Sequence, residues 1–246
     1  MLILIIDTAT TLGSVALVEW SDNSETASIK PLALTAAVLK QHAETLIERI
    51  EWCFEISGRK KEDLEAVVYV RGPGSFTGLR TGLATAKGIA IGLDIRIVGV
   101  STLKCLAVNM APHPDPVAVV TDARRSEVFV GCYDVSDAFR DPVTLLEEQA
   151  AAPAHALQLL EKTVAGSGRC ILTGNGIGVY EDVFSQLKAE NGWTRAPEYA
   201  SAPSALNAAF LGILRLIKGQ SDDVNDAVPV YLRDSGAVPM KSVLDS

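Results

Sequence analysis

The first apolar run of the chain spans residues 2–6 and ends at Asp7. A short, continuously apolar run of this kind is typical of a buried strand. Small polar residues fill positions 7–13, as in a hairpin turn, and residues 14–19 are again rich in valine and leucine. The chain therefore opens with a predicted strand, an aspartate, a polar turn and a return strand.

The same order recurs in the second half of the chain. Residues 117–121 form an apolar run, residues 122–126 a polar turn and residues 127–133 a return run. Two such strands can arise without duplication. A duplicated unit followed by helices, however, predicts an α/β protein with two lobes facing each other across a cleft. The actin-like and sugar-kinase superfamily, whose lobes have a ribonuclease-H-like core, is built in this way.

We expect residues 1–104 together with about 204–234 to form the N-terminal lobe, and residues 105–203 the C-terminal lobe. Residues 235–246 have the composition of a loose tail. The other expected elements are helices at about 36–54, 75–93, 145–162 and 204–218, strands at 64–70, 95–100 and 170–173, a loop at 174–178 and an extended segment at 229–233.

The predicted helix at 36–54 has two different faces. One apolar stripe should cover the sheet of its own lobe, and it consists of Leu39, Ala43, Leu46, Ile47, Ile50 and Phe54. A second line mixes apolar and polar groups, and it consists of Val38, His42, Thr45, Arg49, Trp52 and Ile56. A tryptophan on a second face is a candidate for contact with another chain, although it would equally serve to cover its own lobe.

The most distinctive segment spans residues 71–82 and leads into the next predicted helix. Its first part predicts a tight turn and a helix cap, through Gly72, Pro73, Gly74 and either Ser75 or Thr77. A glycine-rich turn before a helix is also an anion site, but this segment lacks the Gly-Lys-Ser/Thr ending of a phosphate-binding loop. We favour a structural turn. The second interpretation is an anion, or an acidic group of a partner, held by Arg71 or Arg80.

Small residues recur at every fourth position of the following helix, at Gly78, Gly82, Ala86 and Ala90. Each glycine lowers helix propensity by about 1 kcal/mol relative to alanine, so a flat side that another helix can approach closely is the natural reason for them. The predicted partner surface therefore joins this stripe and Leu79 to the second line of the preceding helix.

Composition narrows the classes of protein. The chain has 246 residues, 48% of them hydrophobic, which is enough for one large domain or two lobes. Its 4 cysteines form no Cys-x-x-Cys pair, which favours core residues in a reducing compartment. The start shows no signal-peptide pattern and no run is long enough for a membrane span, so we expect a cytoplasmic protein. With a net charge of -8, the chain should bind RNA poorly by itself.

Candidate catalytic groups are few. The 3 histidines are far apart along the chain, so we expect no metal site, and no motif implies a cofactor or a serine nucleophile. Asp7 and Asp122 lie where kinase relatives carry phosphate- and metal-associated acids, but Ala9 stands where those relatives have glycine. We therefore expect vestigial cleft residues that cap turns. The alternatives are an ATP-dependent, sugar-kinase-like enzyme and a glycoprotease-like metallopeptidase that use the cleft.

Several segments, in the same order, resemble the TsaB family, also called YeaZ. They are residues 5–10, His42, and residues 72–80, 99–103, 122–124, 127–128 and 231–233. The Gly-Pro-Gly-Ser-Phe-Thr-Gly-Leu-Arg run is specific to TsaB and its close relative TsaD. The matches cover most of the chain, with little support from residues 145–201.

The resemblance implies a non-catalytic subunit that forms a heterodimer with its catalytic paralogue TsaD and also recruits the ATPase TsaE. We expect a homodimer when the chain is alone, and contact with tRNA only through the complex. TsaD would transfer threonylcarbamoyl to the adenosine beside the anticodon of tRNAs that read codons beginning with adenosine. The pairing would use the first two helices of each partner, which here are the Trp52 helix and the helix at 78–93.

Overall fold

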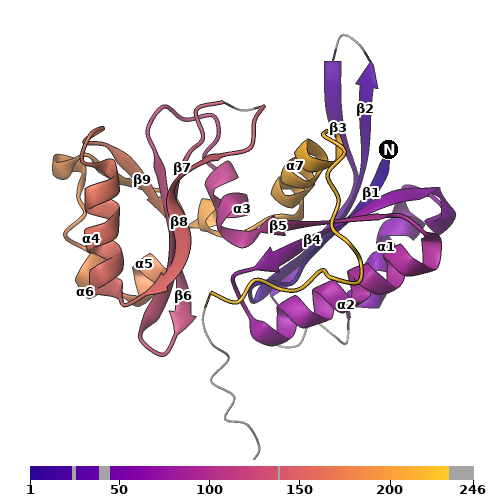
Figure 1. The fold of residues 1–246 in the computed structure, drawn as a ribbon, viewed down its shortest axis with the longest axis horizontal. Coiled ribbons are helices and arrows are strands. Elements are labelled where there is room, and N and C mark those ends of the chain that lie inside the picture. The colour runs from indigo at the N-terminus through magenta and orange to yellow at the C-terminus, as the bar shows by residue number, and fades with distance from the viewer. Residues whose placement is uncertain (24–25, 39–44, 138, 233–246) are drawn as a thin grey trace, which may run out of the picture.

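The computed structural model describes the chain except for residues 24–25, 39–44, 138 and 233–246. It contains two five-stranded sheets, one from each half of the chain (Figure 1). The strands of the first sheet are β1 (Leu2–Asp7), β2 (Leu12–Asn23), β3 (Thr26–Val38), β4 (Leu64–Gly72) and β5 (Arg96–Ser101). Those of the second are β6 (Val117–Arg124), β7 (Glu127–Asp134), β8 (Val143–Ala151), β9 (Cys170–Thr173) and β10 (Trp193–Arg195).

Both sheets have the same strand order. The first runs β3-β2-β1-β4-β5 and the second runs β8-β7-β6-β9-β10. In each sheet the first two strands form an antiparallel hairpin, and the first strand pairs in parallel with the fourth. The repeated order confirms the predicted duplication and the two-lobed, actin-like α/β fold.

The helices cover the outer faces of the sheets and fill the space between them. They are α1 (Leu46–Ser57), α2 (Phe76–Leu93), α3 (Thr102–Val108), α4 (Pro153–Val164), α5 (Gly176–Val179), α6 (Glu181–Phe184) and α7 (Ala205–Leu216). Short 3-10 helices are η1 (Lys61–Asp63), η2 (Ala189–Asn191) and η3 (Glu198–Ser201).

Each face of the first sheet has its own core. α1 and α2 cover one face, where Leu46, Phe54 and Leu83 are buried (Figure 1). α7 covers the opposite face with Ala208 and Leu211. Both faces are apolar because the central strands carry Ile, Leu and Val in succession, so β1 is buried on both sides.

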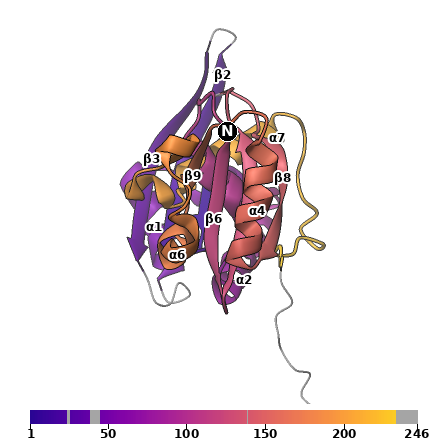
Figure 2. The ribbon, with the colours of Figure 1, turned by 90° about the vertical axis from the view of Figure 1, so that its left-hand side faces the viewer.

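The second sheet is covered on its outer face by α4 and α6, which lie in front of it in Figure 2. Its inner face packs against Leu103 and Leu106 of α3, while Cys105 of the same helix belongs to the core under α7. α3 therefore contacts both halves of the molecule. The expected lobe boundary at residue 104 falls within this helix, and the expected division of the chain stays a prediction.

After α7 the chain returns across the first lobe, and we call residues 222–232 the C-terminal strap. The N–H of Asp222 donates to the carbonyl of Ile97 at 2.8 Å, beside β5. Ala227 is buried in the core under α1 and α2. The N–H of Val230 then donates to the carbonyl of Arg71 at 2.7 Å. The strap thus leads from the edge of the first sheet to the start of α2 (Figure 1).

The first predicted helix begins later than expected. β3 continues to Val38 because it pairs with β2 over its whole length, from Asn23 opposite Thr26 to Leu12 opposite Val38. This pairing overrides the helical preference of the alanines at positions 36 and 37. α1 begins only at Leu46, and residues 39–44 lie outside the described residues. Val38 is a strand residue, so its predicted place on the helix is wrong.

The predicted helix at 145–162 is wrong in its first part. β8 occupies residues 143–151 and pairs with β7. α4 begins at Pro153, whose fixed φ suits the first turn of a helix. The expected loop at 174–178 includes the short helix α5. The sequence pattern does not predict the strands β3, β8 and β10 or the helix α3.

Candidate functional site

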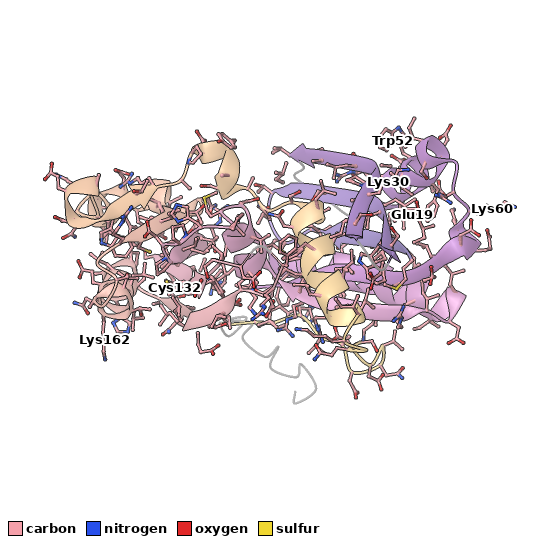
Figure 3. The ribbon with its side chains drawn as sticks, turned by 90° about the horizontal axis from the view of Figure 1, so that it is seen from above. Glu19, Lys30, Trp52, Lys60, Cys132 and Lys162 are labelled. Carbon is pink, nitrogen blue, oxygen red and sulfur yellow. The ribbon has the colours of Figure 1, made fainter. Side chains whose placement is uncertain are left out.

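The outward face of α1 carries large apolar side chains. Ile47, Trp52 and Ile56 are 53%, 44% and 61% exposed, although the pattern assigned Ile47 to the buried stripe. Figure 3 shows Trp52 at the periphery of the molecule. The same face carries exposed acids, which are Glu48, Glu51 and Glu55. Exposed tryptophan and isoleucine on one helix face form the kind of apolar surface that protein interfaces use.

The small-residue stripe of α2 faces its own sheet. Its members Gly78, Leu79, Gly82, Ala86 and Ala90 are all buried. A Cβ atom on Gly78 would lie 2.0 Å from the carbonyl oxygen of Thr8, and one on Gly82 would lie 2.3 Å from the Thr8 Oγ1. The glycines therefore let α2 approach the end of β1. The stripe is not available to a helix of another chain in this structure, which corrects the prediction.

The outward face of α2 also consists mainly of small residues. The exposed small residues are Thr77, Ala84, Gly88 and Gly92, and the exposed larger residues of the helix are Phe76, Arg80 and Ile91. Apart from the neighbouring backbone of α2 itself, no atom of the described residues lies within 4 Å of the position that a Cβ would take at Gly88 or Gly92. Ile91 is 63% exposed. A helix of another chain can therefore approach α2 closely from this side.

The other residues of the predicted second line lie in different places. Val38 is 78% exposed on β3. His42 lies outside the described residues. Thr45 precedes α1, and its hydroxyl is buried. Trp52 and Ile56 are the residues of that line that the structure places on the outward face of α1.

Arg49 of the same line turns inward. Its Nη2 donates to the carbonyl oxygens of Gly13 at 2.7 Å and Thr35 at 2.9 Å. Burial lowers the pKa of the guanidinium below its usual value, while the nearby Cys53 and Asp7 oppose that change. Arg49 therefore ties α1 to β2 and β3 of its own sheet.

The turn before α2 fits closely against the first hairpin. The N–H of Ser75 donates to the carbonyl of Ala9 at 2.7 Å. A Cβ on Gly74 would lie 2.2 Å from the same carbonyl oxygen, so only glycine fits this approach. The Oγ of Ser75 accepts the N–H of Gly78 at 3.3 Å and caps α2. These contacts describe a structural turn.

The two aspartates near the ends of β1 and β6, Asp7 and Asp122, each accept a hydrogen bond from a backbone N–H of the turn that follows. The side chain of Asp7 is fully buried, and its Oδ1 accepts the N–H of Ala9 at 3.0 Å. Burial raises the pKa of Asp7 to about 6, and the N–H of Ala9 and the charge of Arg49 oppose that rise. The Oδ1 of Asp122 accepts the N–H of Arg124 at 2.8 Å, and the Oδ2 lies 3.2 Å from the Arg124 Nη1.

A cavity of about 490 Å³ lies between the two hairpin turns. Its wall comes from both turns, the start of α2 and the end of the strap, and includes Thr10, Ser75, Asp122, Arg125, Asn175 and Tyr231. A second cavity of about 520 Å³ is lined by charged residues of both lobes, including Arg71, Lys104, Glu147 and Glu148. Leu232 lines both cavities.

Within the described residues, no group of three or more His, Cys, Asp or Glu is placed to hold a metal ion. The Nδ1 of His113 accepts the N–H of Asp115 at 3.0 Å. In the same part of the chain, no helix is long and apolar enough to cross a bilayer. Cys53, Cys105, Cys132 and Cys170 are buried and free.

Comparison with known proteins gives the family of the chain. The family model for TsaD, tRNA N6-adenosine threonylcarbamoyltransferase, matches residues 35–240. A protein of Escherichia coli named tRNA threonylcarbamoyladenosine biosynthesis protein TsaB is 30% identical over 240 residues, which are 96% of this chain and 96% of that protein. The chain belongs to the TsaB family.

Other TsaB proteins agree with this assignment. The TsaB protein of Bacillus subtilis is 31% identical over 173 residues, 70% of this chain and 71% of that protein. The solved structure of YeaZ from Pseudomonas aeruginosa superposes with a TM-score of 0.71 at 23% identity and covers 94% of this chain and 100% of that chain. The fold is therefore shared, and the resemblance to TsaB and YeaZ is confirmed.

Two of the segments that resemble the TsaB family meet in space. The ring centroids of Phe76 and Tyr231 are 5.1 Å apart, and the guanidinium carbon of Arg80 lies 3.9 Å from the centre of the Phe76 ring. The Nε of Arg80 donates to the hydroxyl of Tyr231 at 3.0 Å. Sequence analysis named Arg80 but missed Phe76 and Tyr231 as its neighbours, because the two segments are far apart along the chain.

Proposed function

We propose that this chain is a non-catalytic partner subunit in the biosynthesis of threonylcarbamoyladenosine in tRNA. It binds a TsaD-type paralogue, and that paralogue transfers threonylcarbamoyl to the adenosine beside the anticodon of tRNAs that read codons beginning with adenosine. The names of the E. coli, B. subtilis and Haemophilus influenzae relatives support the pathway. The family model for a threonylcarbamoyltransferase supports a relationship with the catalytic partner.

The observation that carries the proposal is the apolar surface on the outward faces of α1 and α2. Trp52, Ile56 and Ile91 are 44%, 61% and 63% exposed on helices that cover the same face of the first sheet. When another protein covers apolar surface that is otherwise in contact with water, the complex is stabilised by roughly 25 cal/mol per Å² of surface buried. Glu48 and Glu55 border this surface and limit the partners that fit.

A supporting role is also consistent with the state of the two acids at the hairpin turns. Asp7 is enclosed, and it does not border the cavity between the turns. Asp122 borders that cavity, but its carboxylate contacts Arg124, and Tyr180 donates to it at 3.4 Å. Neither carboxylate is presented to a substrate in the way that phosphoryl transfer requires.

The remaining partners follow from the same proposal. A TsaE-type ATPase binds the assembled pair, and a homodimer forms through the same helices when the paralogue is absent. The tRNA is held by the complex, because a chain with a net charge of -8 offers little attraction to phosphate. Such a complex works in the cytoplasm, where tRNA is modified.

The decisive experiment measures the affinity of this chain for the TsaD-type paralogue from the same cell, by isothermal titration. Trp52→Ala removes the largest exposed side chain of α1. We expect affinity to fall by about 10-fold or more, as for an interface hot spot. Tyr199→Ala is the matched control, because Tyr199 is 85% exposed in η3 of the second half. It should leave the affinity unchanged.

Reconstituted modification of tRNA gives the second measurement. Threonylcarbamoyladenosine formation should require this chain and should fall with the affinity of the Trp52→Ala variant. Unchanged affinity of both variants would count against the α1 surface. Full modification by the paralogue without this chain would contradict the proposed role itself.

A further inference from the structure

Arg80 has hydrogen-bond donors that the part of the chain described by the structure does not use. A guanidinium carries five N–H donors, and within the described residues only the Nε of Arg80 donates, to Tyr231. Its flat face rests on the Phe76 ring. Among the described residues, no carboxylate forms an ion pair with Arg80, in contrast to Arg59, which pairs with Glu19 at 2.8 Å. The four terminal N–H groups have no partner in the described part of the chain, so another molecule can bind them.

The rings that support Arg80 are held in place from both sides. Phe76 is the first residue of α2, directly after the Ser75 cap. The neighbours of Tyr231 fix the strap: Val230 donates its N–H to Arg71, and Leu232 packs against the core of the second sheet. A guanidinium that stacks on one fixed ring and is hydrogen-bonded to the hydroxyl of another loses little conformational entropy when it binds, which is the condition for a preorganised site.

The cluster of Phe76, Arg80 and Tyr231 is also accessible. Phe76 is 40% exposed and Tyr231 is 42% exposed, and Arg80 is exposed as well. The cluster lies at the start of α2, beside Thr77 on the outward face of that helix. Aromatic residues and arginine are the residues that most often dominate the energy of protein interfaces.

We propose that Phe76, Arg80 and Tyr231 form a binding site for a carboxylate side chain of the TsaD-type partner. The proposal rests on the proposed function and names the chemistry of one contact within it. A carboxylate pairs with the terminal nitrogens of a guanidinium through two parallel hydrogen bonds, and the rings keep water from one side of the pair. The cation thus selects an aspartate or glutamate at this end of α2.

A protein carboxylate suits the cluster better than a phosphate of RNA. The apolar rings continue the outward face of α2, which offers contacts to a protein, while the net charge of -8 repels nucleic acid. The glutamates on the outward face of α1 favour basic groups of the same partner. An acid at the start of α2 and basic groups opposite α1 together fix the orientation of the partner.

The test is a double-mutant cycle on the complete chain and its TsaD-type paralogue. Arg80→Ala should weaken binding by about 10-fold or more, and Tyr231→Phe, which keeps the ring but loses the hydroxyl that orients Nε, by about 3-fold. Each surface Asp and Glu of the paralogue is replaced by Ala in turn. One of these changes should weaken binding to the wild-type chain but have no further effect in the Arg80→Ala background.

Arg140→Ala is the matched control, because Arg140 is an exposed arginine whose ion pair within the described residues is with Asp137 on its own loop. It should bind as the wild type does. If the cluster merely clamps the strap, Arg80→Ala will speed hydrogen exchange in residues 222–232 while every paralogue variant stays additive, and the proposal is then wrong.

Two further outcomes would also overturn the proposal. If the Arg80→Ala variant binds the paralogue with wild-type affinity while the Trp52→Ala variant binds it more weakly, the proposed carboxylate site is wrong. The proposed function is then unaffected. Weaker self-association without weaker partner binding would assign the cluster to a second copy of this chain. Failure of the wild-type chain to bind the paralogue at all would instead remove the proposed function.

Discussion

The carboxyl group of Asp7 lies in the interior of the first lobe. Its Oδ2 is buried without a hydrogen-bond partner among the described residues, while its Oδ1 accepts the N–H of Ala9. Burial raises the pKa from 3.8 to about 6. Because the folded state keeps the proton to a higher pH, this group favours folding below about pH 4, and that contribution is lost as the pH rises through 6.

Asp7→Asn should therefore change the pH dependence of stability. Asparagine keeps an acceptor for Ala9 and carries no charge, so the variant should be more stable than the wild type at pH 7.5 by about 1–3 kcal/mol and nearly equal to it at pH 3.5. Urea unfolding at several pH values measures this difference. Asp182→Asn, at an exposed position, should show no such trend. A difference that is the same at every pH would contradict the assignment.

Single residues differ in how far their sequence context predicts them. The aspartate after an apolar strand predicts the turn that Asp7 caps, because that interaction is local. Its elevated pKa depends on burial by distant segments, and no local pattern reveals it. Trp52 is exposed, as the interpretation of it as a contact for another chain required. Arg49 shares the predicted line with Trp52 but turns inward, toward carbonyl groups that only the folded sheet brings near.

At the scale of the element, α2 has small residues on two opposite sides. The inner side includes Gly78 and Gly82, and the outer side includes Gly88 and Gly92. Helical spacing shows which residues share a side, but it does not show which side faces the sheet. That is why the sequence predicted a flat helix correctly but assigned to the partner the flat side that the structure buries against the sheet.

Alanine substitution should separate the two sides of α2. Gly78→Ala should lower the free energy of unfolding by about 1–3 kcal/mol, because its Cβ would lie 2.0 Å from the carbonyl oxygen of Thr8. Gly88→Ala should raise it by about 0.5–1 kcal/mol, because that position is open and alanine favours a helix. Urea titration of both variants provides the comparison. If the two substitutions changed the free energy of unfolding equally, the assignment of the Gly78 side of α2 as the side facing the sheet would be wrong.

Elements formed by distant pairing were the hardest to predict. β8 was expected to be helical, yet it is a strand because β7 supplies its hydrogen bonds. β3 is likewise stabilised by its long ladder with β2. By contrast, β1, β4 and β6 each contain a continuously apolar run, at residues 2–6, 66–70 and 117–120, and that local signal is enough to predict a buried strand.

For the whole molecule, Glu148 is a link between the two halves. Its Oε1 accepts hydrogen bonds from the hydroxyl of Ser101 in β5 and, at 2.7 Å, from the hydroxyl of Tyr133 in β7. Burial and the charge of Glu148 hold the pKa of Tyr133 well above its usual value. The carboxylate thus joins the first sheet to the second.

Glu148→Ala should loosen this link. We expect the free energy of unfolding to fall by about 1–3 kcal/mol, since two hydroxyl groups with little access to water lose their acceptor. Hydrogen exchange should also become faster at the start of α3, where the Ser101 Oγ accepts the N–H of Leu103 at 3.1 Å. Glu147→Ala is the control, because Glu147 is exposed beside it. Similar losses in both variants would rule out a specific link.

The two-lobed architecture followed from the sequence because the strand, aspartate, turn and strand occur twice. The path of the strap did not. Residues 222–232 carry few regular apolar positions, and their contacts with Ile97, Arg71 and Arg80 join segments that are far apart along the chain. Such a path depends on the completed fold, which a reading of local patterns does not contain.

The position of the strap near residue 231 affects the order in which parts of the protein are completed during synthesis. A ribosome adds Tyr231 only after it has added every strand of both sheets, so the strands of a nascent chain can pair while the end of α2 that carries Phe76 and Arg80 still lacks its third member. Recognition that uses this end of α2 must then wait until translation has passed residue 231.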